Sequence, residues 1–268
     1  MSPLIAFEGS RGLIAGSCVL LSPYLALTAK HVIEEIERHF GKDRLSSLDI
    51  YIIHFNSQYI WYVSYISSWI GTDISALVLL PRNEQVKLCN FSNLLMTVDP
   101  PLVDSAVTAI GYHKSQINVD RNDSEITNLS LNLNPIVSTG LVHEIHQSIR
   151  DVSLINFPSF SIKAHFKSGM SGGAVFNDKK ELAGLICSGF DVELENDEGH
   201  ATAVSLWPSL IIKVKFTSQN YFPRGIELNK EYSLKELATL GCLNIYGHER
   251  IEFFKHENGS DGVRRRHE

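Results

Sequence analysis

The chain has few cysteines, and no two of them lie close together. Its four, Cys18, Cys89, Cys187 and Cys242, form no C-x-x-C pair. Zinc sites and disulfide frameworks are recognised by closely or regularly spaced cysteines, and neither pattern is present. Reduced thiols of this kind are typical of cytosolic proteins. We therefore expect a cytoplasmic protein with no bound metal and no cofactor.

The chain also lacks an excess of positive charge. Its formal net charge is -6, which gives no basis for binding nucleic acid. Its one basic cluster, Arg264–Arg266, lies in a polar C-terminal stretch and is interpreted as a solvated end. No nucleic-acid partner is expected.

A long unbroken apolar run is missing as well. Residues 12–29 carry no charge, but Pro23 interrupts them, and their Gly and Ser residues are spaced like two short strands and a turn. The letters AGSC at 15–18 resemble a lipoprotein processing site, yet Glu8 stands where a signal peptide has basic residues. We expect neither secretion nor a membrane partner.

Short strand patterns fill most of the 268 residues. The chain is 44% hydrophobic and 20% charged, which is enough to bury a sizeable core. Apolar stretches rich in β-branched and aromatic residues are bounded by Gly, Ser, Asn or Pro. They lie at 13–21, 24–32, 48–55, 59–66 and 74–80, then at 106–113, 128–145, 160–166, 172–176, 181–190 and 200–206.

Pro100 and Pro101 separate these strands into two groups of similar size. Two such groups predict two packed antiparallel barrels. We expect an N-terminal barrel over residues 1–99, a C-terminal barrel over 100–215 and an extension of unknown role over 216–268. Within the extension, Ser233 with Glu236 three residues later predicts a short helix that stops at Gly241.

The stretch KSGMSGGAVF, residues 167–176, surrounds Ser171 with glycines. An acyl-transfer site needs backbone N–H groups aimed at the developing oxyanion, and Gly169 and Ser171 could supply two of them. Gly172 and Gly173 would let the chain turn tightly and let a substrate approach. Taken alone, the stretch fits a plain glycine turn almost as well.

A serine nucleophile needs an adjacent base that a third group orients. In LTAKHV, His31 stands at the end of an apolar strand, just before an expected helical turn. In TDISALVL, Asp73 stands at the start of a strongly apolar strand. Each residue alone is more often ordinary, the histidine structural and the aspartate a turn or cap residue.

The three motifs in this order resemble those of the trypsin-like (chymotrypsin-fold) serine proteases. The resemblance covers roughly residues 3–215. It implies two packed six-stranded antiparallel β-barrels, followed here by a short α-containing extension. It also implies that His31 is the general base, Asp73 its orienting partner and Ser171 the nucleophile, with the oxyanion hole formed by the N–H groups of Gly169 and Ser171.

Further stretches resemble the HtrA (Deg) branch of that family, without a PDZ domain. These are LVDSAVTAIGYH, PIVSTGLVHEI and ELAGLICSGF. The last resembles the strand beside which the substrate backbone lies, which implies that Cys187, Ser188 and Gly189 pair with substrate. Met170 stands where secreted members carry an aspartate, so activation by N-terminal processing is not expected.

Cleavage specificity is left open by the sequence. His165, six residues before Ser171, corresponds to the base of the primary pocket, and His200 could border it. A histidine in place of an aspartate at 165 weakens the expectation of cleavage after lysine or arginine, and His200 at the pocket would favour an acidic or amide side chain. His200 fits a solvent-facing position on a strand equally well. The stretch DVELENDEG, 191–199, predicts an acidic surface loop.

The leading hypothesis is a serine endopeptidase that cleaves protein or peptide substrates and is regulated by an activating partner or ligand. The alternative is a catalytically silent pseudoprotease that binds peptides or proteins. An α/β-hydrolase elbow is not matched, because the serine loop leads into a strand pattern and not a helix. The HEIH at 143–146 lacks the H-E-x-x-H spacing of a helical metal pair.

Overall fold

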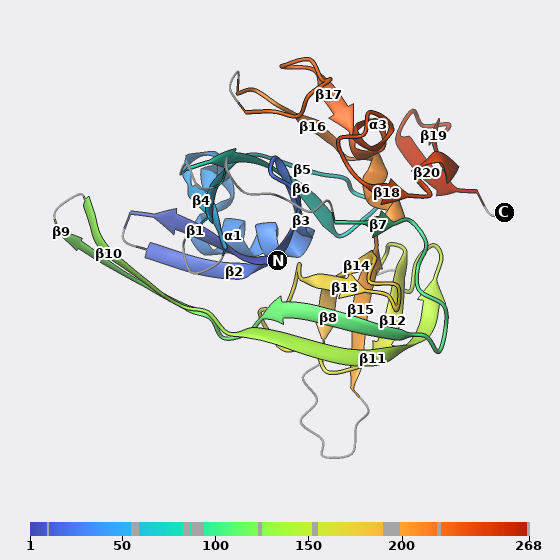
Figure 1. Cartoon of the computed structure of the whole chain (residues 1–268), viewed down its shortest axis with the longest axis horizontal. Coiled ribbons are helices and arrows are strands. Elements are labelled where there is room, and N and C mark those ends of the chain that lie inside the picture. Colours follow the sequence, from blue (N-terminus) through green and yellow to red (C-terminus); the bar gives the residue numbers. More distant parts are fainter. Residues whose placement is uncertain are drawn as a thin grey trace.

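Alternating apolar strands in the first part of the chain close into a six-stranded barrel (Figure 1). The structure is a computed structural model and describes residues 1–9, 11–54, 59–82, 86, 94–122, 125–151, 155–189, 199–218 and 221–266. Around the barrel the strands follow the order β1-β2-β3-β6-β5-β4. They are β1 (Ser2–Glu8), β2 (Arg11–Ser22), β3 (Leu25–Ala29), β4 (Asp49–His54), β5 (Tyr59–Ser68) and β6 (Ile74–Pro81).

Helix α1 (Lys30–Phe40) follows β3 directly and packs its apolar face on this barrel. Val32 and Ile36 are buried there together with Trp61 of β5, whose indole N–H donates to the carbonyl of Pro23. The burial fixes the start of the helix against β3 and β6. That start is where the first candidate site residue lies.

The second barrel also has six strands. They are β8 (Ala106–Tyr112), β11 (Pro135–His146), β12 (Ser159–Lys163), β15 (His200–Ser205), β14 (Leu182–Gly189) and β13 (Ala174–Phe176), and pairing of β13 with β14 closes the ring. Two short strands, β7 (Met96–Thr97) and β18 (Ile245–Tyr246), extend the sheet in parallel beyond β14. The predicted mostly β, double-barrel fold is confirmed.

Two strand predictions need correction. The sequence pattern did not indicate β1, although its residues pair with both β2 and β4 and complete the ring. The stretch 128–145, predicted as one strand, is divided at residues 133–134 into β10 (Glu125–Asn132) and β11. Strand β10 pairs with β9 (Gln116–Asn122), and β9 and β10 form a hairpin that is separate from the barrel sheet.

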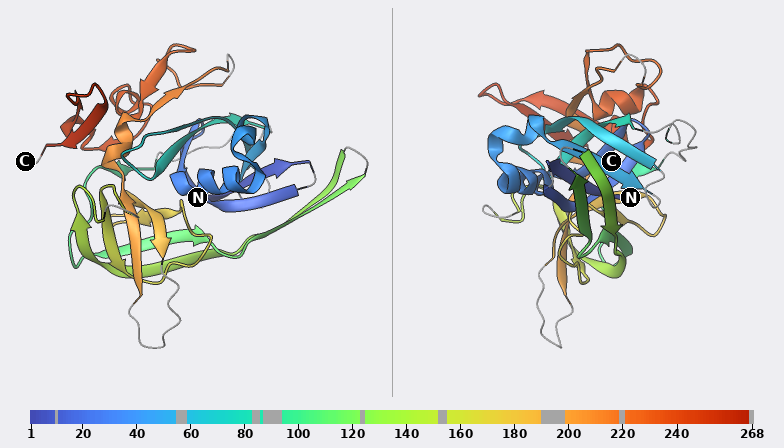
Figure 2. Two further views of the ribbon diagram at one scale, coloured as in Figure 1. Left: turned by 180° about the vertical axis from the view of Figure 1, so that it is seen from behind. Right: turned by 90° about the vertical axis from the view of Figure 1, so that its left-hand side faces the viewer.

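The β9–β10 hairpin leaves the second barrel as an arm and runs alongside the first (Figures 1 and 2). Ile117 and Leu131 of the arm pack on Ile5, Phe7 and Ile53 of the first barrel. This apolar contact joins the two barrels away from their direct interface.

The C-terminal extension packs on both barrels. It contains β17 (Glu231–Ser233), α3 (Leu234–Thr239), β19 (Ile251–Lys255) and β20 (Asp261–Arg265), and β17 pairs with β16 (Lys213–Lys215), which directly precedes the extension. Among the described residues the 3₁₀ turns are η1 (Lys42–Ser47), η2 (Trp207–Ile211) and η3 (His248–Arg250). The predicted cap is present: the Ser233 hydroxyl accepts from the Glu236 N–H, and the Glu236 carboxylate accepts from the Ser233 N–H at 2.7 Å.

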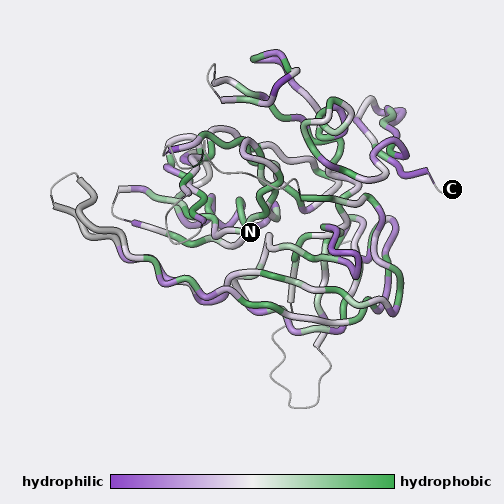
Figure 3. Tube along the Cα trace, in the orientation of Figure 1, coloured by the Kyte–Doolittle hydropathy of each residue, from purple (hydrophilic) through white to green (hydrophobic). Residues whose placement is uncertain are grey.

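Buried apolar residues of this extension share one core with strands of both barrels. Phe216, Leu234 and Leu237 belong to the same cluster as Leu27 and Leu185. Figure 3 shows hydrophobic residues along the strands of the barrels and hydrophilic ones near the C-terminus. Within the part of the chain that the structure describes, no helix is both long and apolar enough to cross a membrane.

Candidate active site

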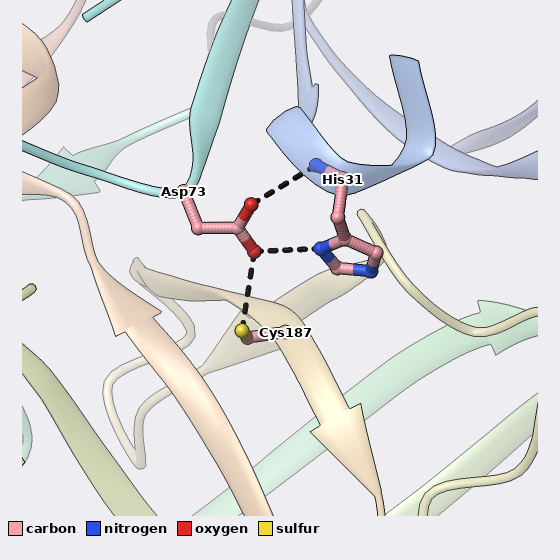
Figure 4. Close-up of side chains that lie close together, drawn as sticks. All are labelled: His31, Asp73 and Cys187. Atoms are coloured by element: carbon pink, nitrogen blue, oxygen red, sulfur yellow. Dashed lines mark hydrogen bonds and ion pairs between the residues drawn. The ribbon is translucent and has the colours of Figure 1, made fainter. Parts of the chain in front are cut away.

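His31 and Asp73 are joined by two hydrogen bonds at the point where α1 leaves β3 (Figure 4). The His31 ring Nδ1 lies 2.7 Å from Asp73 Oδ2, and the His31 backbone N–H donates to Asp73 Oδ1 at 3.0 Å. The N–H of Lys30 donates to the Asp73 carbonyl at 3.0 Å. Because a carboxylate can only accept, the ring proton lies on Nδ1, which leaves Nε2 with a free lone pair. His31 is the second residue of α1 and not the end of a strand, so the helix begins before His31 and not after it as predicted.

The surroundings of this pair favour the charged imidazolium. The Asp73 side chain is 9% exposed and that of His31 is 37% exposed. Burial lowers the pKa of His31, but the hydrogen bond and charge of Asp73 and the charges of Glu34 and Glu35 raise it by more. The net effect is a raised pKa. The ring can therefore accept a proton more readily than an ordinary histidine.

Cys187 of β14 supplies a further donor to the same carboxylate. Its thiol donates to Asp73 Oδ2 at 3.1 Å, so that this oxygen accepts from both the ring and the thiol. Burial, followed by the charge and hydrogen bond of Asp73, raises the pKa of the thiol well above its ordinary value. The sulfur is therefore present as the thiol S–H beside Asp73.

The glycine loop before β13 holds Ser171 against the first barrel. The Ser17 N–H donates to the Ser171 carbonyl at 2.8 Å. Gly172 has a φ of +78°, and a Cβ there would meet the Ser17 carbonyl oxygen at 2.2 Å and Thr28 Oγ1 at 2.4 Å. Only glycine fits at 172, both for its left-handed backbone and for this close approach.

The N–H groups of Gly169 and Ser171 in this loop have no acceptor among the described residues. Met170 donates to the Lys167 carbonyl and Gly172 to the Ile186 carbonyl, whereas the N–H groups of Gly169 and Ser171 make no hydrogen bond in this part of the chain. Gly169 also has a positive φ, +89°. These are the two donors that the sequence predicted for an oxyanion hole, and they are available to a ligand.

The Ser171 hydroxyl is directed to the carbonyl of Cys187, at a long 3.5 Å. Within the described residues no hydrogen bond joins it to the His31 ring. Hydrogen bonds between catalytic groups are often long or misaligned in ligand-free enzymes and form fully only with substrate. In this structure the Ser171 hydroxyl is therefore directed to the Cys187 carbonyl and not to the His31 ring.

Two residues that the sequence did not single out fasten this loop. His113, just after β8, approaches the Ser168 carbonyl with its Nδ1 at 2.7 Å. The Ser17 hydroxyl donates to the Gly169 carbonyl at 3.3 Å and accepts from the Tyr112 N–H at 2.9 Å. No sequence motif marks His113 or Ser17, because their role depends on contacts between segments far apart in the chain.

The predicted substrate-binding residues lie on β14, β15 and the segment before the serine loop. Ser188 and Gly189 pair through their backbones with Thr202 and Ala201 of β15. The exposed His165 lies beside Gly199, where a Cβ would come within 2.8 Å of the ring.

His200 is exposed, and its ring centroid lies 6.2 Å from that of His143 on β11. This fits the solvent-facing alternative for His200 and places the HEIH stretch in a strand. Residues 191–198 of the predicted acidic loop lie outside the described residues. The substrate-binding roles stay predictions.

A cavity of about 500 Å³ opens beside the His31–Asp73 pair. Its walls combine apolar and charged side chains. It is lined by Lys30, His31, Glu34, Ile70, Thr72, Asp73, Arg150, Asp151, Ile155, Asn156, Phe157 and Cys187. A side chain of a bound peptide could enter here, next to the candidate base.

Comparison with known proteins identifies the family. Residues 16–185 match the family model of the trypsin-like peptidase domain. Among curated proteins no significant relative is found. Similar solved structures include an inactive, serine-to-alanine form of Rv3671c from M. tuberculosis H37Rv, which is 13% identical, with 76% of this chain and 80% of that chain covered and a TM-score of 0.45. They also include the HtrA-type protease AlgW with a decapeptide, which is 18% identical, with 73% of this chain and 49% of that chain covered and a TM-score of 0.48. Because the family model covers more than half of the chain, this protein belongs to the trypsin-like peptidase domain family.

Proposed function

We propose that this peptidase-family chain is a serine endopeptidase that cleaves proteins or peptides through an acyl-enzyme. The observation that carries the proposal is the His31–Asp73 pair at 2.7 Å, linked through Cys187 to Ser171, whose loop offers two N–H groups without an acceptor among the described residues. The alternative, a silent pseudoprotease, has no need of a fixed ring tautomer together with unoccupied N–H donors.

The chemistry follows from these positions. Ser171 Oγ rotates from the Cys187 carbonyl to His31 Nε2, gives its proton to the ring and attacks the scissile carbonyl. Asp73 keeps the Nδ1 proton in place and stabilises the imidazolium that forms. His31 then protonates the leaving amine, and a water molecule, activated by the same ring, hydrolyses the ester on Ser171.

The oxyanion that forms in each step would be held by the N–H groups of Gly169 and Ser171. Such donors act on charge that exists only in the transition state, and losing one costs about 10²–10³ in kcat. The hydroxyl of Ser171 and these donors belong to one short loop, so the nucleophile and the oxyanion site are fixed relative to each other.

Three further parts of the proposal extend beyond this chemistry. We assign residues 1–99 to the first barrel, 100–215 to the second and 216–268 to the extension. A cytoplasmic location is supported by the thiols of Cys18 and Cys187, which are free, buried and used as hydrogen-bond donors. Regulation by a partner or ligand is supported by the Ser171 hydroxyl, which is not yet directed to His31.

Labelling with a fluorophosphonate probe, read by intact mass, tests the proposal. One adduct is expected on the purified chain and none on Ser171→Ala or His31→Ala. An adduct that appears only in cell lysate would indicate an activating partner. No adduct under either condition, on protein shown to be folded, would overturn the proposal in favour of a pseudoprotease.

His113 is expected to position the oxyanion hole. Its Nδ1 donates to the Ser168 carbonyl, and since C=O and N–H point in opposite directions in a trans peptide, this contact turns the Gly169 N–H to the other side. We expect His113→Ala to lower kcat about tenfold with little change in KM, less than outright loss of a donor.

Steady-state peptide hydrolysis would measure this change. His113→Asn is the matched control, because its side-chain amide can reach the same carbonyl as the ring nitrogen, and it should retain most of the activity. Equal losses of kcat in the two variants would show that the hydrogen bond to the Ser168 carbonyl does not position the oxyanion hole.

A further inference from the structure

Three side chains with metal-binding atoms meet at the candidate active site. His31 Nδ1, an Asp73 carboxylate oxygen and Cys187 Sγ all lie within 4.8 Å of one another (Figure 4). Imidazole, carboxylate and thiolate are the three ligand types that zinc accepts in proteins. No sequence motif indicates such a site, because these residues stand far apart in the chain.

The cavity beside them gives an ion a path and a place for a fourth ligand. All three residues line it, and so does Thr72, which is 2% exposed. Among the described residues the Thr72 hydroxyl has no hydrogen-bond partner. A buried hydroxyl without a partner is costly, and a water molecule bound to an ion in this cavity would satisfy it.

We propose that His31, Asp73 and Cys187 form an inhibitory site for a thiophilic divalent cation such as Zn²⁺. Cys187 is the residue that makes the site possible. A hydroxyl in its place would donate the same hydrogen bond to Asp73, but only a sulfur adds a soft ligand to the imidazole and the carboxylate.

The geometry requires small movements of these side chains. The ring nitrogen and the carboxylate oxygen are 2.7 Å apart, and the thiol sulfur and that oxygen 3.1 Å apart. Zinc bonds of about 2.0–2.3 Å in a tetrahedral arrangement place ligand atoms roughly 3.3–3.6 Å apart. The ion would therefore separate two hydrogen-bonded pairs by about half an ångström each and take the place of their shared protons.

The proton balance shows why binding would inhibit. Cys187 loses its thiol proton to solvent as the sulfur–metal bond forms. Nδ1 can bind the ion only through its lone pair, so its proton leaves and Nε2 takes one up, with no net change on the ring. Nε2 is then a donor and can no longer accept the proton of Ser171.

Titration of the metal-free chain with Zn²⁺ and Cd²⁺ tests the site without relying on activity. Native mass and the ultraviolet charge-transfer band of a cadmium–thiolate bond are the readouts. We expect one ion per chain and the band on the wild type. Cys187→Ser should lose the band and bind at least about tenfold more weakly, whereas Cys242→Ser, a matched control at a half-buried thiol outside the cavity, should behave as the wild type.

Inhibition is tested separately by fluorophosphonate labelling with and without Zn²⁺. The wild type and Cys242→Ser should be protected by the ion, and Cys187→Ser should label at the same rate in both conditions. A band that persists in Cys187→Ser, or equal protection of all three chains, would overturn the proposal. If no chain labels at all, the proposed protease function fails, while the ion titration still decides the metal site.

Discussion

Replacing Ser171 or His31 with alanine should each lower kcat by about 10⁶-fold. Ser171 carries the atom that attacks the substrate, and His31 is the group that can take its proton, since Asp73 holds the ring with Nε2 free. A hydroxyl without its base is too weak a nucleophile to retain the acyl-enzyme route. KM should change little, because most of the cavity that could hold a peptide side chain is lined by other residues.

The double variant sharpens this prediction. Because the two groups act as one unit, removing both should cost no more than removing one. The residual rate, about 10³–10⁴ above that in water, would come from the N–H donors and substrate binding. Hydrolysis of a fluorogenic peptide under saturating conditions measures all three chains. If the losses multiplied, the residues would act in separate steps, contrary to the mechanism.

Asp73→Asn should lower kcat by about 10⁴-fold with little loss of stability. The amide can donate a hydrogen bond where the carboxylate only accepted one, so it favours the ring tautomer with the proton on Nε2. His31 would then present a donor to Ser171. The carboxylate also neutralises the imidazolium in the transition state, and the amide does not.

The pH dependence of kcat/KM gives an independent test of the same residue. Neutral His31 is the active form, and its pKa is raised by Asp73, Glu34 and Glu35 against the effect of burial. The rate of the wild type should therefore fall as the pH drops through a value above the ordinary 6.5 or so. In Asp73→Asn, the acid limb should move to lower pH because the main raising influence is gone.

Glu34→Gln is the matched control for that profile. Glu34 acts on the ring by charge alone and through no hydrogen bond to it, so the variant should move the acid limb slightly downward and keep the plateau rate. The profiles are best recorded with a chelator present. An acid limb that stays in place in Asp73→Asn would mean that it reports a group other than His31.

Local patterns in the sequence were sufficient for the fold class and for the candidate residues. Alternating apolar stretches indicated most of the barrel strands, and the Ser233–Glu236 cap forms from residues three apart. The glycines near Ser171 are required by backbone geometry that only glycine adopts without strain, such as the φ of +78° at Gly172. These features depend on neighbours in the chain, which is why a sequence reveals them.

The tertiary structure decided what these residues touch. The carboxylate of Asp73 accepts a hydrogen bond from the thiol of Cys187, 114 residues away, and the Ser168 carbonyl accepts one from His113. The β9–β10 hairpin lies along the first barrel because Ile117 and Leu131 find an apolar surface there. Such contacts form between residues that are distant in the sequence, and closure and packing of the two barrels bring those residues together. The reactive groups are therefore a property of the residue types in the sequence. Their hydrogen-bond partners are selected by the packing of the folded chain.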